Sequence, residues 1–210
     1  MPVSIITRSY RTSELRNLVS YLEINKETEK EVIAVSVIKD CDIDGAEVII
    51  EDSNRFEARI TGIKKAHFDK ILLLDSDQIP EDGLLSELDA MDEHMVIIPE
   101  RSQNKGLTSK CMDDWRMRNE KLARTKISPY IPVVPRFYRR EPLMQAIYNL
   151  PNNVRKIISH EDSVLYYEVF KITRNIGFSE KYIYNIEPNF IKLMHKCNVS
   201  RISGQSEKLI

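Results

Sequence analysis

Apolar runs alternate with amphipathic segments through the first hundred residues. Short aliphatic or β-branched runs, which are typical of strands, lie at residues 3–7, 30–40, 46–52, 70–74 and 94–100. Apolar residues spaced three or four apart, which indicate helices, follow from Thr12 or Ser13, at 54–67 and at 80–91. This alternation predicts a single α/β domain, with a central, mostly parallel sheet flanked by helices on both faces.

The second half of the chain is less regular. Residues 101–130 are polar and mixed in charge, with one stretch, 111–124, that could form a helix. Two prolines within residues 131–141 predict an edge strand or a loop, because proline has no N–H to donate to a neighbouring strand. Further helices are expected at 142–150, at 159–177 with Gly177 as C-cap, and at 188–197, and a strand is expected at 181–186.

Composition narrows the class of protein. The chain has 210 residues, 42% of them hydrophobic, and a net charge of −1, so bulk charge does not indicate a nucleic-acid partner. Its three cysteines, Cys41, Cys111 and Cys197, are far apart and lack metal-ligand spacing, which favours a reducing cytoplasm over a disulfide framework. The first residues do not resemble a signal peptide, and no apolar run approaches the roughly 20 residues that cross a bilayer.

Residues 71–81, ILLLDSDQIPE, join an aliphatic run to two carboxylates. In open α/β sheets, ligands bind beyond the carboxyl ends of the strands, and alternate residues of a strand point the same way. Asp75 and Asp77 could therefore face one ligand, and their hard oxygens suit Mg²⁺ or Mn²⁺, which in turn bind phosphate. From these residues alone, the alternative is a turn that caps the next helix.

A second polar cluster, RFYRR, contains Arg136, Arg139 and Arg140. Arginine stabilises a diphosphate through paired hydrogen bonds. Strand alternation would place Arg136 and Tyr138 on one face, and Arg136, which directly precedes the aromatic pair, is the candidate for a site. The alternative is a solvated edge.

The order of these motifs resembles that of a known family. The stretch NRFEARITGIKKAHFDKILLLDSDQIPEDGLLSEL resembles the middle part of the family 2 glycosyltransferases. In that family, an Arg-containing helix and a strand lead into a metal-binding D-x-D motif. The family's first strand and helix look like VSIITRSYRTSELRNLVSYL, and its late fingerprint looks like PRFYRRE followed by HEDSVLYYEVFK. The resemblance covers residues 3–195 and implies a GT-A fold.

The resemblance also implies a function. It is that of an inverting hexosyltransferase, which moves a sugar from a UDP- or GDP-linked donor to a hydroxyl acceptor, such as a lipid-linked glycan or a polysaccharide, assisted by Mn²⁺ or Mg²⁺. Residues 1–100 would bind the nucleotide sugar, residues 101–198 would form the acceptor-binding and catalytic half of the same domain, and 199–210 would be a tail.

The resemblance implies a donor site as well. Thr7, Ser9 and Tyr10 would lie beside the nucleotide, and Asp40 (or Glu51 or Asp52) would meet the base. Arg59 and Arg136 would lie near the diphosphate, Asp75 at the ribose or the metal, and Asp77 at the metal.

The family's second acidic motif matches SHEDS, residues 159–163. In the family, the Asp of this pair is the general base that takes the proton from the acceptor hydroxyl. Here that residue is Asp162, which lies beside Glu161, and a helix N-terminus would favour its charged form. From the residues alone, the alternative is two surface acids in the first turn of a capped helix.

Two positions depart from the family pattern. The family's DDGS after its second strand is replaced by KDCD and EDSN, which concerns the recognition of the base. The histidine that many relatives carry after the next strand is replaced by Asn185, with His195 as a second candidate. The carbonyl oxygen of Asn185 could bind a metal, and its amide could donate to a phosphate.

Other functions stay open at this point. ILLLDSDQI also looks like the first motif of the haloacid dehalogenase-like phosphatases, although that motif normally opens its domain; Asp75 would be the nucleophile and Asp77 the acid/base. A nucleotidyltransferase would need a Gly-rich loop that TRSYRT lacks, and a non-catalytic nucleotide-sugar-binding relative is a third class.

A basic segment near the C-terminus predicts either a solvated helix or peripheral contact with the inner face of a membrane, and its charged residues are Lys192, His195, Lys196 and Arg201.

Overall fold

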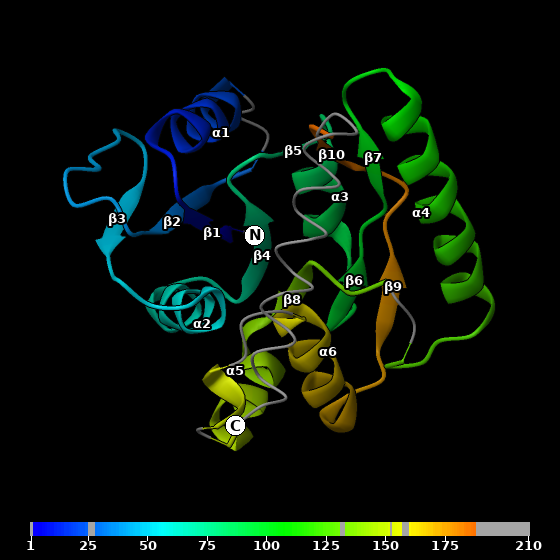
Figure 1. Ribbon diagram of the computed structural model, residues 1–210. Coiled ribbons are helices and arrows are strands. Elements are labelled where there is room, and N and C mark those ends of the chain that lie inside the picture. The colour runs from blue at the N-terminus through cyan, green and yellow to red at the C-terminus, as the bar shows by residue number, and fades with distance from the viewer. Residues whose placement is uncertain (1, 25–27, 131–132, 152, 157–159, 188–210) are drawn as a thin grey trace, which may run out of the picture.

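The computed structural model describes residues 2–24, 28–130, 133–151, 153–156 and 160–187. A seven-stranded sheet lies at its centre, in the strand order β3-β2-β1-β4-β8-β6-β9 (Figure 1). Every pairing in this sheet is parallel except those of β8 with β4 and β6. The strands are β1 (Val3–Ser9), β2 (Lys30–Ser36), β3 (Glu47–Ile50), β4 (Lys70–Asp75), β6 (Met95–Ile97), β8 (Phe137–Arg139) and β9 (Ile176–Phe178). The predicted α/β class and mostly parallel sheet are confirmed.

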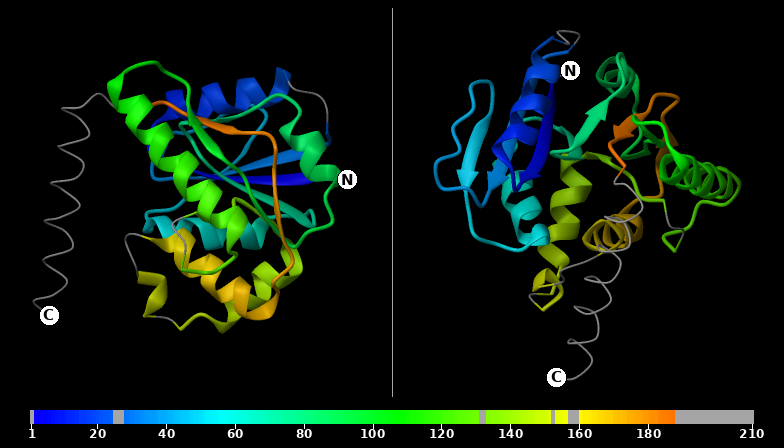
Figure 2. Two further views of the ribbon diagram at one scale, coloured as in Figure 1. Left: turned by 90° about the vertical axis from the view of Figure 1, so that its right-hand side faces the viewer. Right: turned by 45° about the horizontal axis from the view of Figure 1, so that its top comes forward.

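Helices cover both faces of the sheet, as the amphipathic pattern predicted. On one face α1 (Thr12–Ile24) and α3 (Leu84–Ala90) bury their leucines, and on the other lie α2 (Arg55–Lys65), α5 (Arg140–Asn149) and α6 (Glu161–Ile172). Figure 2 shows the strands as a middle layer between these two sets of helices. A longer helix, α4 (Leu107–Thr125), packs beside β7 at the side of the molecule, and a short 3₁₀ helix spans Val154–Lys156. The two buried clusters explain why the helical spacing was visible in the sequence.

A second, three-stranded sheet stands at one end of the large one. It consists of β5 (Gln78–Pro80), β10 (Ile183–Asn185) and β7 (Glu100–Ser102), with β10 in the middle. Its register places Asn185 opposite Gln78 on one side and opposite Ser102 on the other. The small sheet therefore gathers polar residues from three distant parts of the chain beside the end of β4.

The prediction of an edge strand or loop at 131–141 is confirmed as a loop for residues 133–136 and is wrong for 137–141. Strand β8 is internal and pairs with β4 on one side and β6 on the other. Pro135 stands two residues before the strand, so the paired residues keep their N–H groups. The predicted alternation is confirmed, because Phe137 joins the cluster under α1 and α3 while Tyr138 joins the cluster under α2, α5 and α6.

Several predicted boundaries also change. Helix α6 ends at Ile172, and Gly177 lies in β9 and not at a helix C-cap. A Cβ on Gly177 would lie 2.8 Å from the Cε of Met91 and 2.9 Å from Glu93, so those two flexible side chains would have to shift to admit a larger residue. His67, the last residue of the helix expected at 54–67, lies beyond the end of α2 and is exposed. The predicted helix at 188–197 lies outside the described residues.

Helix α2 sits unusually close to the sheet. Its N-terminus is capped by Asn54, whose side chain accepts hydrogen bonds from the backbone N–H groups of Phe56 and Glu57. Gly62 faces β1, and a Cβ at this position would lie 2.4 Å from the Cγ2 of Ile6. This close approach carries the side chain of Arg59, one turn earlier, into the interior beside the end of β4.

Candidate functional site

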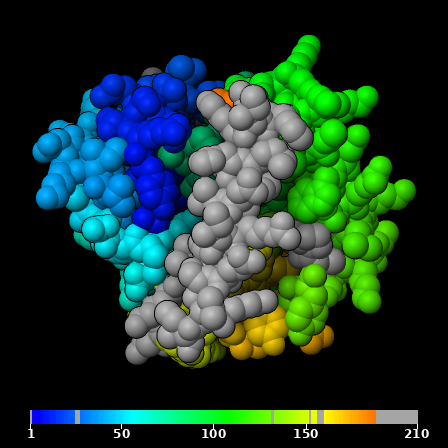
Figure 3. All heavy atoms as spheres, in the orientation of Figure 1, coloured from blue at the N-terminus to red at the C-terminus, as the bar shows by residue number. Residues whose placement is uncertain are grey.

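A cleft of about 340 Å³ opens at the carboxyl ends of β1 and β4. Its lining includes four of the predicted site residues, which are Tyr10, Asp75, Asp77 and Asn185. The space-filling view places the N-terminal segments, blue to cyan, and α4, green, on opposite sides of one face of the molecule (Figure 3). The site therefore lies where ligands bind in open α/β sheets.

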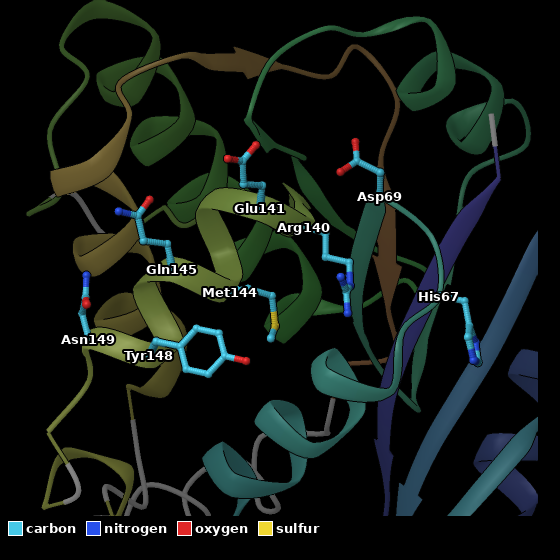
Figure 4. A pocket seen from close by; sticks show the side chains of 8 residues that line it. All are labelled: His67, Asp69, Arg140, Glu141, Met144, Gln145, Tyr148 and Asn149. Carbon is cyan, nitrogen blue, oxygen red and sulfur yellow. The ribbon is translucent and has the colours of Figure 1, made fainter.

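A larger groove of about 710 Å³ lies elsewhere, between α5 and the start of β4. It is lined by His67, Asp69, Arg140, Glu141, Met144, Gln145, Tyr148 and Asn149, which Figure 4 shows as sticks. None of the predicted site residues lines it. Because β4 begins beside this groove and ends at Asp75, the groove lies at the opposite end of that strand from the carboxylates. Size alone would have selected a groove that none of the predicted site residues lines.

Asp75 ends β4 and accepts two arginines on one oxygen. Its Oδ1 lies 2.5 Å from Nη2 of Arg55 and 2.8 Å from Nη2 of Arg59, and its Oδ2 lies 3.9 Å from Nη2 of Arg136. Burial opposes ionisation of this carboxyl, but the three guanidinium charges outweigh burial and hold its pKa far below the usual range. Asp75 is therefore a permanent anion at physiological pH.

The two predicted acidic motifs meet through these same arginines. Asp162 pairs with Arg59 through Oδ1, and its Oδ2 lies 3.1 Å from Nη1 of Arg136. Glu161, which is buried, pairs with Nε of Arg55 at 2.8 Å. Both acids begin α6, directly after His160, whose backbone is left-handed with φ 64° and whose side chain makes no capping hydrogen bond. The D-S-D and H-E-D motifs, 85 residues apart from Asp77 to Asp162, thus form one charged cluster.

The pKa values of the three arginines shift in different directions. Burial lowers the pKa of Arg59, which is 3% exposed. Burial also acts to lower the pKa of Arg136, but the neighbouring Glu100 and Asp75 raise it overall. For Arg55, burial is outweighed in the same way by Asp75 and Glu161. The cluster keeps buried and partly buried charges of both signs together, which is tolerated because each has an opposite charge beside it.

Glu100 is a member of the site that sequence reasoning missed. Its Oε1 accepts hydrogen bonds from Nε and Nη2 of Arg136, at 3.1 and 3.0 Å, and its Oε2 accepts from the amide of Asn185 at 3.1 Å. Gln78 links this pair to β4, since it donates to Oδ1 of Asn185 at 2.9 Å and accepts from the backbone N–H of Asp75 at 2.9 Å. This chain of bonds orients Arg136 toward Asp75 and Asp162.

Signals for the missed residues were present in the sequence. Arg55 precedes Arg59 by four residues, so both lie on the same face of one helix. Glu100 directly follows the apolar run at 94–99 and stands at a strand end, the position that drew attention to Asp75. A search for all charged residues at strand ends would have found Glu100.

The described residues do not by themselves build a divalent metal site. Among them, no group of three or more His, Cys, Asp or Glu side chains is placed to hold an ion. The carboxylate of Asp75 faces arginines, and Oδ1 of Asn185 accepts from Gln78. Ser76 and Asp77 form a turn, so the extended geometry that would align Asp75 with Asp77 does not persist, although both line the cleft. Metal binding by Asp75, Asp77 and Asn185 stays a prediction, and His195 lies outside the described residues.

The predicted nucleotide contacts are brought to the cleft only in part. Tyr10 is exposed in its lining, with the guanidinium of Arg8 4.4 Å from the ring centroid. Thr7 and Ser9 are buried in β1, and the hydroxyl of Ser9 donates to the carbonyl of Arg11 at 3.0 Å.

The base-recognition candidates Asp40, Glu51 and Asp52 do not line the cleft. Asp40 lies in an exposed turn beyond β2. Its role at a nucleotide base, like those of Thr7 and Ser9 beside the nucleotide, stays a prediction.

Comparison with known proteins shows the fold alone. No protein-family model matches the chain, and no curated protein matches it by sequence. Among solved structures, residues 1–349 of TarS from S. aureus superpose with a TM-score of 0.63 at 16% identity, over 89% of this chain and 60% of that one. The TarS structure in complex with UDP-GlcNAc gives 0.62 at 16% identity over 90% and 59%, and the complex with UDP gives 0.59 at 17% over 89% and 61%.

The chain thus spans about three-fifths of the length of these TarS structures. Within the part of the chain that the structure describes, no helix is long and apolar enough to cross a membrane.

Proposed function

We propose that the chain is a nucleotide-sugar-dependent glycosyltransferase of the hexosyltransferase type. The observation that carries the proposal is the convergence of Arg55, Arg59 and Arg136 at the carboxyl ends of parallel strands, beside a cleft. Such a group suits a diphosphate, because each guanidinium offers paired donors to phosphate oxygens. TarS, which has a similar fold, was crystallised in complex with UDP-GlcNAc, a nucleotide sugar.

The arginines would stabilise the leaving group. In glycosyl transfer from such a donor, the bond between the anomeric carbon and the diphosphate oxygen breaks, and its electron pair leaves with the diphosphate. Positive groups that already point at the site of developing charge lower the barrier without reorganising. Arg55 would supply this charge from the lining of the cleft. Arg136 would supply it from behind Asp75, where two hydrogen bonds to Glu100 fix its direction.

Asp162 would be the general base. Its carboxylate takes the proton from the acceptor hydroxyl while the hydroxyl oxygen forms the new bond to the anomeric carbon, on the face opposite the departing diphosphate. Attack on that face inverts the configuration of the sugar. The location of Asp162 at the start of α6, within the arginine cluster, supports this role. Glu161, which is buried against Arg55, would act by holding that arginine.

Donor binding would alter the state of the base. Asp162 is paired with Arg59 and Arg136, and an arginine-bound carboxylate is a weak proton acceptor. A diphosphate would compete for the same guanidinium groups and so weaken their hold on Asp162. The proton acceptor would then become effective only when donor is present.

A thermal-shift panel tests the proposal. UDP-, GDP- and dTDP-sugars are added to the pure protein with and without Mn²⁺, and one class of donor should raise the melting temperature, because ligands that bind only the folded state stabilise it. Slow donor hydrolysis by the same sample would separate an enzyme from a non-catalytic relative. Absence of a shift with every donor would overturn the proposal.

The metal is a separate expectation with its own variant. Mn²⁺ or Mg²⁺ would neutralise diphosphate oxygens, with Asp77 as the exposed carboxylate that lines the cleft and the donor's phosphates as the other ligands. Asp77→Asn should therefore bind donor equally well with and without Mn²⁺, whereas the wild type should bind more tightly with it. An unchanged Mn²⁺ effect in the variant, measured by titration calorimetry, would contradict the role of Asp77.

No specific observation favours the phosphatase alternative. Its nucleophile would be Asp75, and the oxygens of that carboxylate face three arginines.

The acceptor hydroxyl, on a lipid-linked glycan or a polysaccharide, and peripheral membrane contact are further parts of the proposal. The basic segment that suggested the membrane contact lies outside the described residues.

A further inference from the structure

A second pocket, of about 190 Å³, adjoins the arginine cluster on the side of α4. It is bounded by the segment that follows β6, by α4, and by the segment that precedes β8. One part of its wall is apolar and consists of Ile98, Pro99, Val133 and Val134. It is smaller than the pockets of roughly 300–1,000 Å³ that enclose whole drug-sized ligands, so it suits one ring of a larger molecule.

Trp115 gives this pocket an aromatic surface. It is the only tryptophan in the chain, it stands on α4, and it is 51% exposed although it lines the pocket. Asn119, one helical turn later, lines the same pocket, and the rim carries the ion pair of Arg101 with Glu120 at 2.7 Å. The pocket therefore offers an apolar wall and a flat aromatic ring, together with hydrogen-bonding groups at its edge.

We infer that this pocket binds one sugar ring of a saccharide acceptor, stacked on Trp115. The inference rests on the proposed function and names its acceptor class. A pyranose has an apolar C–H face and a hydroxylated edge, and the two sides of the pocket match these two features. A lipid chain would meet charged groups at the rim and at the inner end, where burial without a polar partner is unfavourable.

The pocket connects to the proposed base. Arg136 lines it, and Nη1 of the same side chain lies 3.1 Å from Oδ2 of Asp162. Glu100 and Arg116 also line it, and Arg116 reaches the donor cleft as well. A ring seated on Trp115 would therefore lie one side chain, Arg136, away from Asp162.

The single tryptophan makes the pocket directly observable. Tryptophan emission of the full chain is titrated with methyl β-D-glucopyranoside, methyl β-D-galactopyranoside and N-acetylglucosamine, and at least one should change it saturably. Ribitol, a polyol without a ring, and UDP serve as comparisons and should neither change the emission in this way nor compete. Absence of a response to all three pyranosides would overturn the inference, and so would an equal response to ribitol or competition by UDP.

Variants separate stacking from a purely structural role. Trp115→Ala should raise the acceptor KM in the transfer reaction by about tenfold or more, with the donor KM unchanged, and Trp115→Phe should recover part of the loss. Met117→Ala, at another exposed position of the same helix, should behave as the wild type. An unchanged acceptor KM in Trp115→Ala, or equal losses in both KM values, would overturn the inference.

The two proposals fail in different ways. If no nucleotide sugar shifts the melting temperature but a pyranoside still changes the tryptophan emission, the chain has a saccharide site and the assignment of that site to an acceptor is wrong. If a donor binds and no pyranoside does, the glycosyltransferase proposal stands and the saccharide site is wrong.

Discussion

Replacing Asp162 by Asn is expected to lower the rate of transfer by about 10²- to 10⁴-fold. Asparagine keeps the size of the side chain but cannot accept the proton of the acceptor hydroxyl. Donor binding should persist, because the phosphate-binding groups are arginines and the variant removes an anion that competes for two of them, Arg59 and Arg136. The change should therefore lower kcat and leave the donor-induced shift in melting temperature equal to that of the wild type or larger.

A matched change on the same helix provides the control. Glu168 stands two turns further along α6 and pairs with Lys171, so Glu168→Gln should transfer normally. Both variants are assayed for transfer by mass spectrometry and for donor binding by calorimetry. Normal transfer by Asp162→Asn would show that the base lies elsewhere, and a combined loss of donor binding and stability would assign Asp162 to holding the arginines.

The fold could be predicted where an element follows a simple pattern. Leucines three and four apart mark α1, and Leu15, Leu18 and Leu22 are buried as that spacing requires. The internal position of the three-residue strand β8 was not predicted. The prolines before it favoured an edge, and the pattern could not show that β4 and β6 would pair with it on both sides. Short strands whose place depends on long-range pairing carry little local signal.

The site could be predicted in its members more than in its contacts. Asp75 was predicted because it stands where a strand ends, Asp162 was predicted through the family resemblance, and the structure brings the two together. The sequence could not show that arginines would connect them, since the contact of Arg59 depends on how closely Gly62 lets α2 approach the sheet. The same limit applies to Asp77, whose direction depends on a turn after β4.

Arg59→Met is expected to reduce the free energy of unfolding by about 3–5 kcal/mol. Arg59 is 3% exposed and is paired with Asp75 and Asp162. The methionine side chain fills a similar space but leaves both carboxylates, which are mostly buried, without one of their partners. Chemical denaturation of wild type and variant at the same temperature measures the difference.

The size of this loss should depend on pH. The pKa of Asp75 in the folded protein lies far below its ordinary value of 3.8, because the arginine charges outweigh burial. A depressed pKa contributes stability that is fully present above about pH 4 and is lost as the pH falls toward the folded-state value. The gap between wild type and Arg59→Met should therefore be widest near neutral pH and should narrow in acid, where the carboxyl takes up a proton in both.

A change at an exposed cation of the same helix distinguishes this account from a general loss of helix charge. Lys64 is exposed on α2, and Lys64→Met should alter the free energy of unfolding by less than about 0.5 kcal/mol. A loss in Arg59→Met that stays constant from neutral to acid pH would assign the effect to packing. In that case the pairing of Arg59 with Asp75 would contribute nothing to stability.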